Sequence, residues 1–171
     1  NSDYCVETVR DKDWEAMTNN QRFNFKEINE YDIKEIANNY GSGILIIRNT
    51  VKDAVSTYEY ISNSLGSDNV VLLHGKLDEV DRDANARNIN NAKAVIGTDA
   101  IGVGVHLKHV NVLIMDAPLS IDVFIQRIGR ICRDLESDKD CHVYIIRKNN
   151  KDKEDLPKYY IDWRNKLSKF N

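Results

Sequence analysis

The chain has 171 residues, 42% of them hydrophobic and 30% charged, which is the balance of one globular domain with a full core. A formal net charge of −3 excludes a generally basic surface, so any contact with nucleic acid must be local. No apolar run has the length that spans a bilayer and no secretory signal is visible, so we expect no membrane partner.

The cysteines and the first residue indicate the setting of the chain. Cys5, Cys132 and Cys141 are an odd number at wide spacing, which argues against a disulfide framework or a zinc site. A reducing, cytoplasmic setting is the simplest interpretation, and no metal ligands are predicted. Because the sequence begins with Asn1 rather than Met, we expect it to be a fragment of a longer chain.

The N-terminal quarter predicts one clear helix. Its first residues show little periodicity, apart from an edge strand predicted over 4–9. Apolar residues at helical spacing then predict a helix over 33–40. Asp32 and Glu35 fit a capping box at its start, and Gly41 is its predicted stop.

Five short apolar runs, separated by helical patterns, predict a parallel sheet. The runs are nearly continuous rather than alternating, which is typical of strands buried on both faces. They cover residues 43–47, 70–73, 94–96, 110–115 and 143–146. The order of strands and helices predicts an α/β three-layer domain with right-handed crossovers.

The remaining helices are predicted from their apolar spacing and their starts. One runs over 51–65 with Thr50 as its N-cap, and Ser120 caps another that carries the residues after it. A polar helix is predicted over 79–91. A solvated loop over 148–158 leads to a C-terminal helix that packs on this sheet or on a neighbouring domain, with Tyr160, Ile161, Trp163 and Leu167 at helical spacing.

The segment from Gln126 to Arg133 is the most informative motif. Because successive residues of a helix turn by about 100°, Gln126, Arg130 and Arg133 fall within roughly 60° of one another. The opposite face is apolar, with Phe124, Ile125, Ile128, Ile131 and Cys132. Two guanidiniums beside an amide suit contact with phosphate oxygens, so a phosphate-facing site is the leading hypothesis.

The alternative for this segment is a solvated basic face that Asp122 and Asp134 partly neutralise. Gly129 argues against it, because a glycine inside a helix costs about 1 kcal/mol relative to alanine. Close approach of a ligand or of another backbone would account for that glycine.

Four segments follow predicted strands, at the edge where parallel α/β sheets bind ligands. They are Arg48-Asn49-Thr50, His74-Gly75-Lys76, Gly97-Thr98-Asp99 with Gly102 and Gly104, and Asp116-Ala117-Pro118. Glycine-rich turns and helix N-termini present backbone N–H groups to anions, and threonines add hydroxyls. Each segment alone is most often a simple turn, and only their shared location indicates a phosphate site.

Neither of two acidic stretches is predicted to bind magnesium. Residues 78–81 follow a turn rather than an apolar strand, so they are better explained as the first turn of a helix. Asp116 does end an apolar strand, but the sequence contains no G-x-x-x-x-G-K-[ST] loop that would hold a triphosphate.

As a set, these motifs resemble the C-terminal RecA-like domain of superfamily 2 (DExD/H-box) helicases. Residues 44–50 look like motif IV, Leu73-His74-Gly75 with Asp81-Arg82 like the next conserved block, 97–104 like motif V, and 126–133 like the motif VI pattern Q-x-x-G-R-x-x-R. Residues 118–122 are similar to the CRISPR-associated helicase–nuclease of type I interference, which implies a role in antiviral defence. The resemblance implies one RecA-like domain over 1–171, with its core at about 26–148 and a loop and helix over 149–171.

The resemblance also implies roles for the site residues. ATP with Mg²⁺ would lie against an N-terminal RecA-like domain that this chain lacks, so the chain alone would not hydrolyse ATP. Arg130 and Arg133 would act as arginine fingers, and Gln126 would contact the γ-phosphate or the attacking water. The nucleotide would also meet Gly102, Gly104, Gly129 and Asp99. Single-stranded DNA or RNA would meet Arg48, Asn49, Thr50, His74, Gly75 and Thr98.

One position departs from the family's pattern. Motif V usually places an acid two residues after its glycine, where it reaches the ribose, and this chain has His106 there. We interpret His106 as a packed histidine. Two other functions stay open: a non-catalytic RecA-like module for binding or assembly, and a nucleotide-binding regulatory domain unrelated to nucleic acid.

Overall fold

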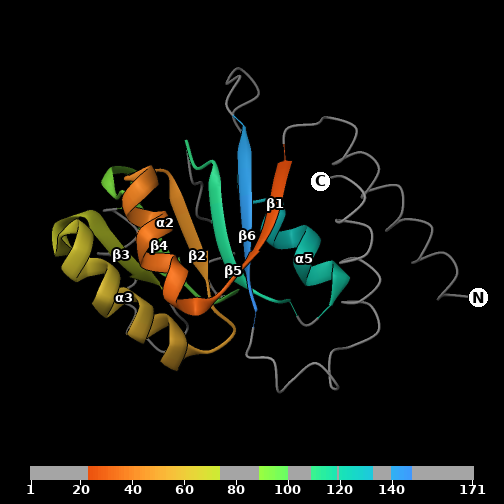
Figure 1. The fold of residues 1–171 in the computed structure, drawn as a ribbon, viewed down its shortest axis with the longest axis horizontal. Helices are drawn as coiled ribbons and strands as arrows, with labels where there is room; N and C mark the ends of the chain where they lie inside the picture. Colours follow the sequence, from red (N-terminus) through yellow and green to blue (C-terminus); the bar gives the residue numbers. More distant parts are fainter. Residues whose placement is uncertain (1–22, 74–88, 100–108, 119, 133–139, 148–171) are drawn as a thin grey trace, which may run out of the picture.

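A sheet of six parallel strands forms the centre of the molecule (Figure 1). The computed structural model describes residues 23–73, 89–99, 109–118, 120–132 and 140–147. The strands are β1 Phe23–Ile28, β2 Ile44–Ile47, β3 Val70–Leu73, β4 Ala94–Gly97, β5 Val112–Asp116 and β6 Cys141–Ile146. Their order across the sheet is β1-β6-β5-β2-β4-β3. The predicted α/β fold with a parallel sheet is confirmed, and each of the five apolar runs overlaps a strand.

Strand β1 was not among the predicted strands. It pairs in parallel with β6, from Phe23 opposite Cys141 to Ile28 opposite Ile146. Within it only Phe25 and Ile28 are buried. The edge strand predicted over 4–9 lies outside the described residues.

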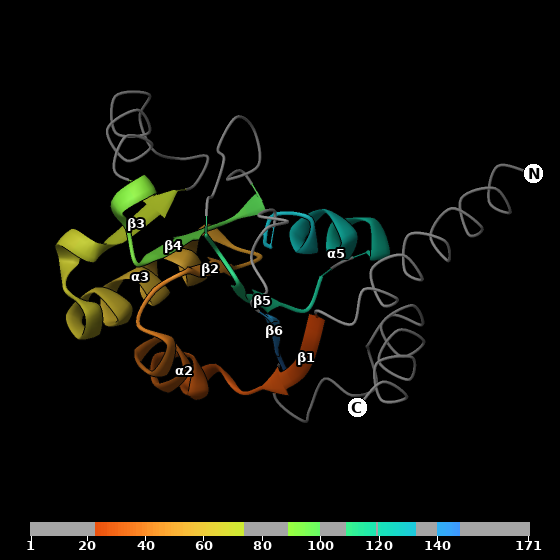
Figure 2. The ribbon, with the colours of Figure 1, turned by 90° about the horizontal axis from the view of Figure 1, so that it is seen from above.

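Helices cover both faces of the sheet (Figures 1 and 2). Helices α2 (Ile33–Tyr40) and α3 (Val51–Leu65) lie on one face, and α5 (Ile121–Ile128) lies on the other. Short 3-10 turns are η1 Glu30–Asp32, η2 Ser67–Asn69 and η3 Ile89–Asn91. Most of the polar helix predicted over 79–91, and all of the predicted C-terminal loop and helix, lie outside the described residues. Among the described helices, none is long and apolar enough to cross a membrane.

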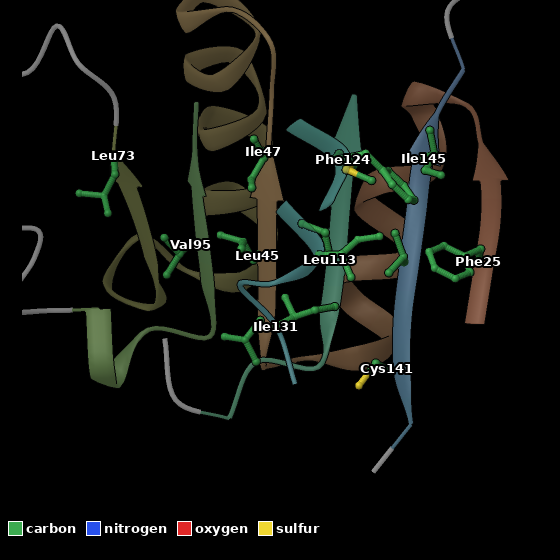
Figure 3. Close-up of a cluster of buried hydrophobic side chains, with 14 of the residues drawn as sticks. Phe25, Leu45, Ile47, Leu73, Val95, Leu113, Phe124, Ile131, Cys141 and Ile145 are labelled. Carbon is green, nitrogen blue, oxygen red and sulfur yellow. The ribbon is translucent and has the colours of Figure 1, made fainter. Parts of the chain in front are cut away.

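The alternation of side chains along the strands builds two separate cores. In β2, Ile44 and Ile46 pack with α2 and α3, whereas Leu45 and Ile47 point to the opposite face. Figure 3 shows that second core, where Phe124 of α5 lies among the strand residues. Central strands buried on both faces explain why the predicted runs were continuously apolar.

The predicted helix starts are right for two helices and wrong for one. The Asp53 N–H donates to the Thr50 hydroxyl at 3.1 Å, and the Val123 N–H donates to the Ser120 hydroxyl at 3.2 Å. The capping box of Asp32 and Glu35 is a wrong prediction, because the turn η1 precedes α2. The Asp32 carboxylate instead accepts from the Asn29 N–H at 3.0 Å, so the chain begins to turn three residues earlier.

Two glycines near the start of β2 have different surroundings, so replacing each with alanine is expected to lower the free energy of unfolding by different amounts. Gly41 ends α2 at φ 73°, as predicted, and Gly43 has φ 71°. A Cβ on Gly41 meets no atom within 4 Å, whereas a Cβ on Gly43 comes within 3.0 Å of the His109 carbonyl oxygen. Gly41→Ala is therefore expected to cost about 1–2 kcal/mol from the left-handed backbone alone. Gly43→Ala is expected to cost about 1–3 kcal/mol more, because the loop before β5 must move. Urea unfolding of both variants gives the comparison, and equal losses would contradict the steric explanation.

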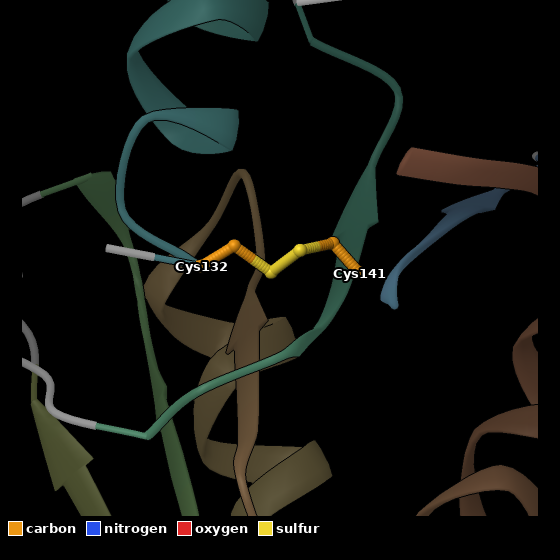
Figure 4. The surroundings of a disulfide bond; sticks show 2 residues. All are labelled: Cys132 and Cys141. Atoms are coloured by element: carbon orange, nitrogen blue, oxygen red, sulfur yellow. A yellow bond between two sulfur atoms is a disulfide. The ribbon is translucent and has the colours of Figure 1, made fainter. Parts of the chain in front are cut away.

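A disulfide joins Cys132 to Cys141 (Figure 4). This corrects the prediction from the cysteine count. Cys132 lies beside the start of β5, where its N–H donates to the Val110 carbonyl at 2.9 Å, and Cys141 begins the neighbouring strand β6. The Cα atoms are 6.2 Å apart, within the usual range of roughly 4.4–6.8 Å for a disulfide. An odd number of cysteines therefore did not exclude a pair that the sheet brings together.

Candidate functional site

The carboxyl ends of three adjacent strands gather polar side chains at one edge of the sheet. Arg48 and Asn49 follow β2, Asp99 lies two residues beyond β4, and Asp116 ends β5. Because β4, β2 and β5 are neighbours and parallel, these ends lie together. Arg127 of α5 reaches the same edge. We call Arg48, Asn49, Asp99, Asp116 and Arg127 the strand-end cluster.

Arg127 donates hydrogen bonds to three of the other four residues of the strand-end cluster. Its Nε and Nη2 donate to the two carboxylate oxygens of Asp99, each at 2.8 Å, which is the bidentate geometry that suits a guanidinium. Nη2 also donates to Asn49 Oδ1 at 2.8 Å, and Nη1 donates to the Asp116 carbonyl at 3.0 Å. The Arg127 side chain is 2% exposed, so one buried cation connects the ends of three strands to α5.

Arg48 is a second buried cation beside Arg127. Its three nitrogens donate to Asp116 Oδ2 at 3.0 Å, to the Thr57 hydroxyl at 2.8 Å and to Glu30 Oε1 at 2.9 Å. Burial by itself lowers the pKa of Arg48, but the carboxylates of Asp116 and Glu30 raise it above its ordinary value. The sequence predicts that Arg48 faces a nucleic-acid backbone. The structure instead leaves this side chain 2% exposed and holds its guanidinium with three protein groups.

Asp116 links the two arginines. Its Oδ2 accepts from Arg48 and, at 2.7 Å, from the Asn49 N–H, while its backbone carbonyl accepts from Arg127. The Asn49 side chain in turn donates to the Ala117 carbonyl at 3.0 Å. The Asp116 side chain is 1% exposed, so this carboxylate is a fixed internal partner of Arg48.

The other predicted site residues that the structure describes lie around this cluster. Thr98 is half-buried, and its N–H donates to the Leu73 carbonyl at 3.3 Å. The exposed Thr50 caps α3 through its hydroxyl. Gln126 is exposed in the last turn of α5, and Arg130 is half-buried in the turn that follows, with its N–H donating to the Arg127 carbonyl at 3.1 Å.

Arg130 therefore does not continue the helical face that carries Gln126, because α5 ends at Ile128. This differs from the predicted single helix over the whole motif. The predicted site residues Arg133, Gly102, Gly104, His74 and Gly75, and the histidine His106, lie outside the described residues.

The sequence argument assumed that Gly129 lies inside a helix, but the structure places it just after the last residue of α5. It is the C-cap of α5 at φ −63°, a conformation open to any residue. An added Cβ would meet the Ile125 and Gln126 carbonyl oxygens at 3.4 and 3.5 Å, which are ordinary contacts. The argument that Gly129 reports a close ligand approach is therefore wrong. Its predicted place at the nucleotide stays a prediction.

The sequence analysis missed Arg127, although the helical spacing contained a signal for it. In projection, Arg127 lies about 60° from Phe124 and about 40° from Ile131, both on the buried face. An arginine so near an apolar face is fully buried only when it is paired, which makes a buried partner the feature to look for. The sequence prediction selected Gln126 and Arg130 instead, because these residues match a known phosphate-binding pattern.

Comparison with known proteins shows the family of the chain. Residues 26–134, more than half of the chain, match the family described as the helicase conserved C-terminal domain. No match is found among curated proteins. Among solved structures, the chain is similar to the DUF1998 helicase MrfA bound to DNA, with 16% identity, a TM-score of 0.65, and coverage of 82% of this chain and 22% of that one. It is thus about a fifth of that protein's length.

Two further structures share the fold. Domain 2 of the DEAD-box helicase Mss116p, bound to an RNA duplex, has 19% identity and a TM-score of 0.61, covering 73% of this chain and 54% of that one. A CRISPR-associated protein has 19% identity and a TM-score of 0.58, covering 71% and 16%. Likeness at such identities shows the fold, which is RecA-like, while the family match covers the motifs themselves. The chain belongs to the helicase conserved C-terminal domain family.

Proposed function

We propose that this chain is the C-terminal half of an ATP-dependent helicase or translocase that acts on single-stranded nucleic acid. The observation that carries the proposal is the meeting of three strand ends with α5 at the carboxyl edge of the sheet. Ligands of parallel α/β sheets bind at that edge. In support, the similar structures of MrfA and Mss116p hold DNA and RNA, and a second MrfA structure holds AMPPNP.

The ATP side of the proposed site lies at the end of α5. An exposed amide, Gln126, and a guanidinium just beyond it, Arg130, are groups that bind phosphate oxygens, so they fit a nucleotide. ATP with Mg²⁺, held mainly by a preceding N-terminal RecA-like domain, would supply the phosphoryl group that is transferred to water. Arg130 and Arg133 would neutralise charge on the phosphates, and Gln126 would orient the γ-phosphate or the attacking water. Backbone at Gly102, Gly104 and Gly129 would line the nucleotide.

The nucleic-acid side lies at the ends of β2, β3 and β4. Asn49, Thr50 and Thr98 offer amides and hydroxyls, and His74 and Gly75 follow β3 in the sequence. Such groups can hold a phosphate backbone without a basic patch, which fits a chain of net charge −3. In this proposal the buried Arg48 holds Asp116, whose carboxylate accepts from the Asn49 N–H. Asp99 acts on the site by binding Arg127.

The test is the ATPase rate of the full-length protein with and without single-stranded DNA or RNA. We expect the nucleic acid to stimulate turnover, and we expect no hydrolysis by this chain alone. A full-length protein that hydrolyses ATP at the same rate with and without either strand is no translocase. Strand binding without any hydrolysis would identify the non-catalytic binding module instead.

The proposal places this activity in the cytoplasm, where glutathione keeps thiols reduced. The Cys132–Cys141 disulfide is the observation against that setting. Cells that express the protein can be lysed in an alkylating reagent and the protein digested for mass spectrometry. Alkylation of both cysteines would support a reducing location, and recovery of an intact Cys132–Cys141 pair would contradict it.

A further inference from the structure

The Cys132–Cys141 disulfide joins two parts of the molecule that are held in different ways. Cys141 is fully buried in β6, and β6 pairs with β1 on one side and with β5 on the other. Cys132 is half-buried and lies in the turn that follows α5 (Figure 4). The sheet therefore holds Cys141 with or without the cross-link, and the turn is the part that the cross-link restrains.

The turn after α5 also carries Arg130, the guanidinium that the proposed function places at ATP. Its backbone bonds include that of the Arg130 N–H to the Arg127 carbonyl at 3.1 Å and that of the Cys132 N–H to the Val110 carbonyl at 2.9 Å. Cys132 has φ 56°, in the left-handed region that residues with a side chain rarely adopt. The disulfide is a covalent restraint on this conformation, two residues after Arg130.

We propose that Cys132 and Cys141 form a reversible redox switch, in which the disulfide lowers the rate of ATP hydrolysis. The inference rests on the proposed function, in which Arg130 reaches the phosphates. Two bonded sulfurs lie about 2.05 Å apart, whereas nonbonded carbon atoms, which are smaller than sulfur, keep about 3.5–4.0 Å. Forming the bond therefore brings the sulfurs closer by more than about 1 Å. Because β6 is fixed between two strands, the movement falls on Cys132 and its turn.

The direction of the effect follows from the proposed location. In a reducing cytoplasm both cysteines are thiols, so the ATP site has to work with the turn in its thiol state. A finger must also extend from its turn to reach a nucleotide held by another domain, and in the disulfide form Arg130 is half-buried. Since a misplacement of about 1 Å costs up to about 100-fold in rate, the disulfide is expected to lower kcat about 10- to 100-fold.

The oxidant that suits this pair is a peroxide. The thiolate of Cys132, the more exposed of the two, attacks one oxygen of hydrogen peroxide. The O–O bond breaks, hydroxide leaves, and a sulfenic acid forms. The thiolate of Cys141 then attacks the Cys132 sulfur and a second hydroxide leaves, so two thiols and one peroxide give one disulfide and two waters. A dithiol reverses the reaction by attacking the Cys132 sulfur, releasing Cys141 as a thiol and leaving as its own disulfide.

The test compares three forms of the full-length protein: unmodified, Cys132→Ser and Cys5→Ser. Serine at position 132 has a similar size but forms no bond to Cys141, and Cys5 is the remaining cysteine of this chain, so its variant is the matched control. Each form is reduced with dithiothreitol, exposed to hydrogen peroxide and reduced again. At each stage kcat and KM for ATP are measured with saturating single-stranded DNA or RNA, and mass spectrometry after alkylation identifies the joined cysteines.

Peroxide is expected to join Cys132 to Cys141 and to lower kcat about 10- to 100-fold in the unmodified protein and in Cys5→Ser, and the second reduction should restore both. Cys132→Ser should keep its kcat at every stage. Cys141→Ala, which leaves the core apolar, should behave in the same way and replaces Cys132→Ser if that variant does not fold. A disulfide that forms without a fall in kcat overturns the inference, and so does a folded protein in which peroxide leaves the two cysteines unjoined.

Amide hydrogen exchange gives a second measurement that does not depend on ATP. The N–H groups of residues 129–132 should exchange more slowly in the oxidised protein than in the reduced one, because the cross-link restrains this turn. Equal exchange in the two forms would show that the bond does not act on the turn, and would overturn the inference. Failure of the proposed function looks different, because the reduced, unmodified protein would then show no stimulation of ATP hydrolysis by either strand.

Discussion

Arg130→Ala in the full-length protein is expected to lower the ATPase rate by about 10³-fold or more, the scale on which arginine fingers act in related NTPases. The reason is electrostatic. The guanidinium would neutralise charge that develops on the phosphates during transfer, inside a site from which water is excluded. Turnover at saturating ATP and nucleic acid gives the measurement.

The fold should survive this substitution. Arg130 lies in the turn after α5 and is half-buried, so the loss in unfolding free energy is expected to be about 1 kcal/mol or less. Lys34→Ala, which removes an exposed cation from α2 on the other face of the sheet, is the matched control and should keep its activity. Normal turnover by Arg130→Ala would remove Arg130 from the ATP site.

Asp116→Ala is expected to destabilise the chain by about 3–5 kcal/mol, the cost of leaving one member of a buried ion pair without its partner. Arg48 stays charged in the variant, and Glu30, 60% exposed, is a weaker partner for it than the sealed Asp116. The Asn49 N–H also loses its acceptor. Since small domains are stable by only about 5–15 kcal/mol, the loss is a large share of the total.

Urea unfolding measures this loss, with Asp68→Ala in the exposed turn η2 as the control. The double variant Arg48→Met/Asp116→Leu sharpens the test, because an apolar pair removes both buried charges together. It is expected to lose less stability than Asp116→Ala alone. A loss below about 1 kcal/mol for Asp116→Ala would show that Arg48 does not depend on this carboxylate.

Sequence patterns found the central sheet because its strands are buried on both faces. Ile44 to Ile47 and Val112 to Met115 are continuously apolar, as is Val70 to Leu73 of β3. Strand β1 does not meet this criterion, because the polar residues Asn24, Lys26 and Glu27 interrupt its apolar pattern. Its partner β6 is far away in the sequence, so no local pattern specifies it.

The sequence predicted the edge of the sheet where the polar strand-end residues gather, but it did not predict which of these side chains pair. Strand ends marked the edge where the strand-end cluster lies, because parallel strands end together. The pairings could not be predicted, since Arg127 with Asp99 and Arg48 with Asp116 are distant in sequence and depend on which strands become neighbours. Cys132 and Cys141 are only nine positions apart, but their pairing also depends on the adjacency of β5 and β6.

The pairing of the first described strand with the last sets the order in which the sheet can be completed. Phe23 lies opposite Cys141, 118 positions later in the chain. At synthesis rates of about 5–20 residues per second, β1 leaves the ribosome about 6–24 s before its partner exists. The inner strands can assemble in that interval, but β1 has no edge to join until β6 arrives. Closing so long a loop is slow, so the docking of β1 is expected to be among the last folding events of this domain.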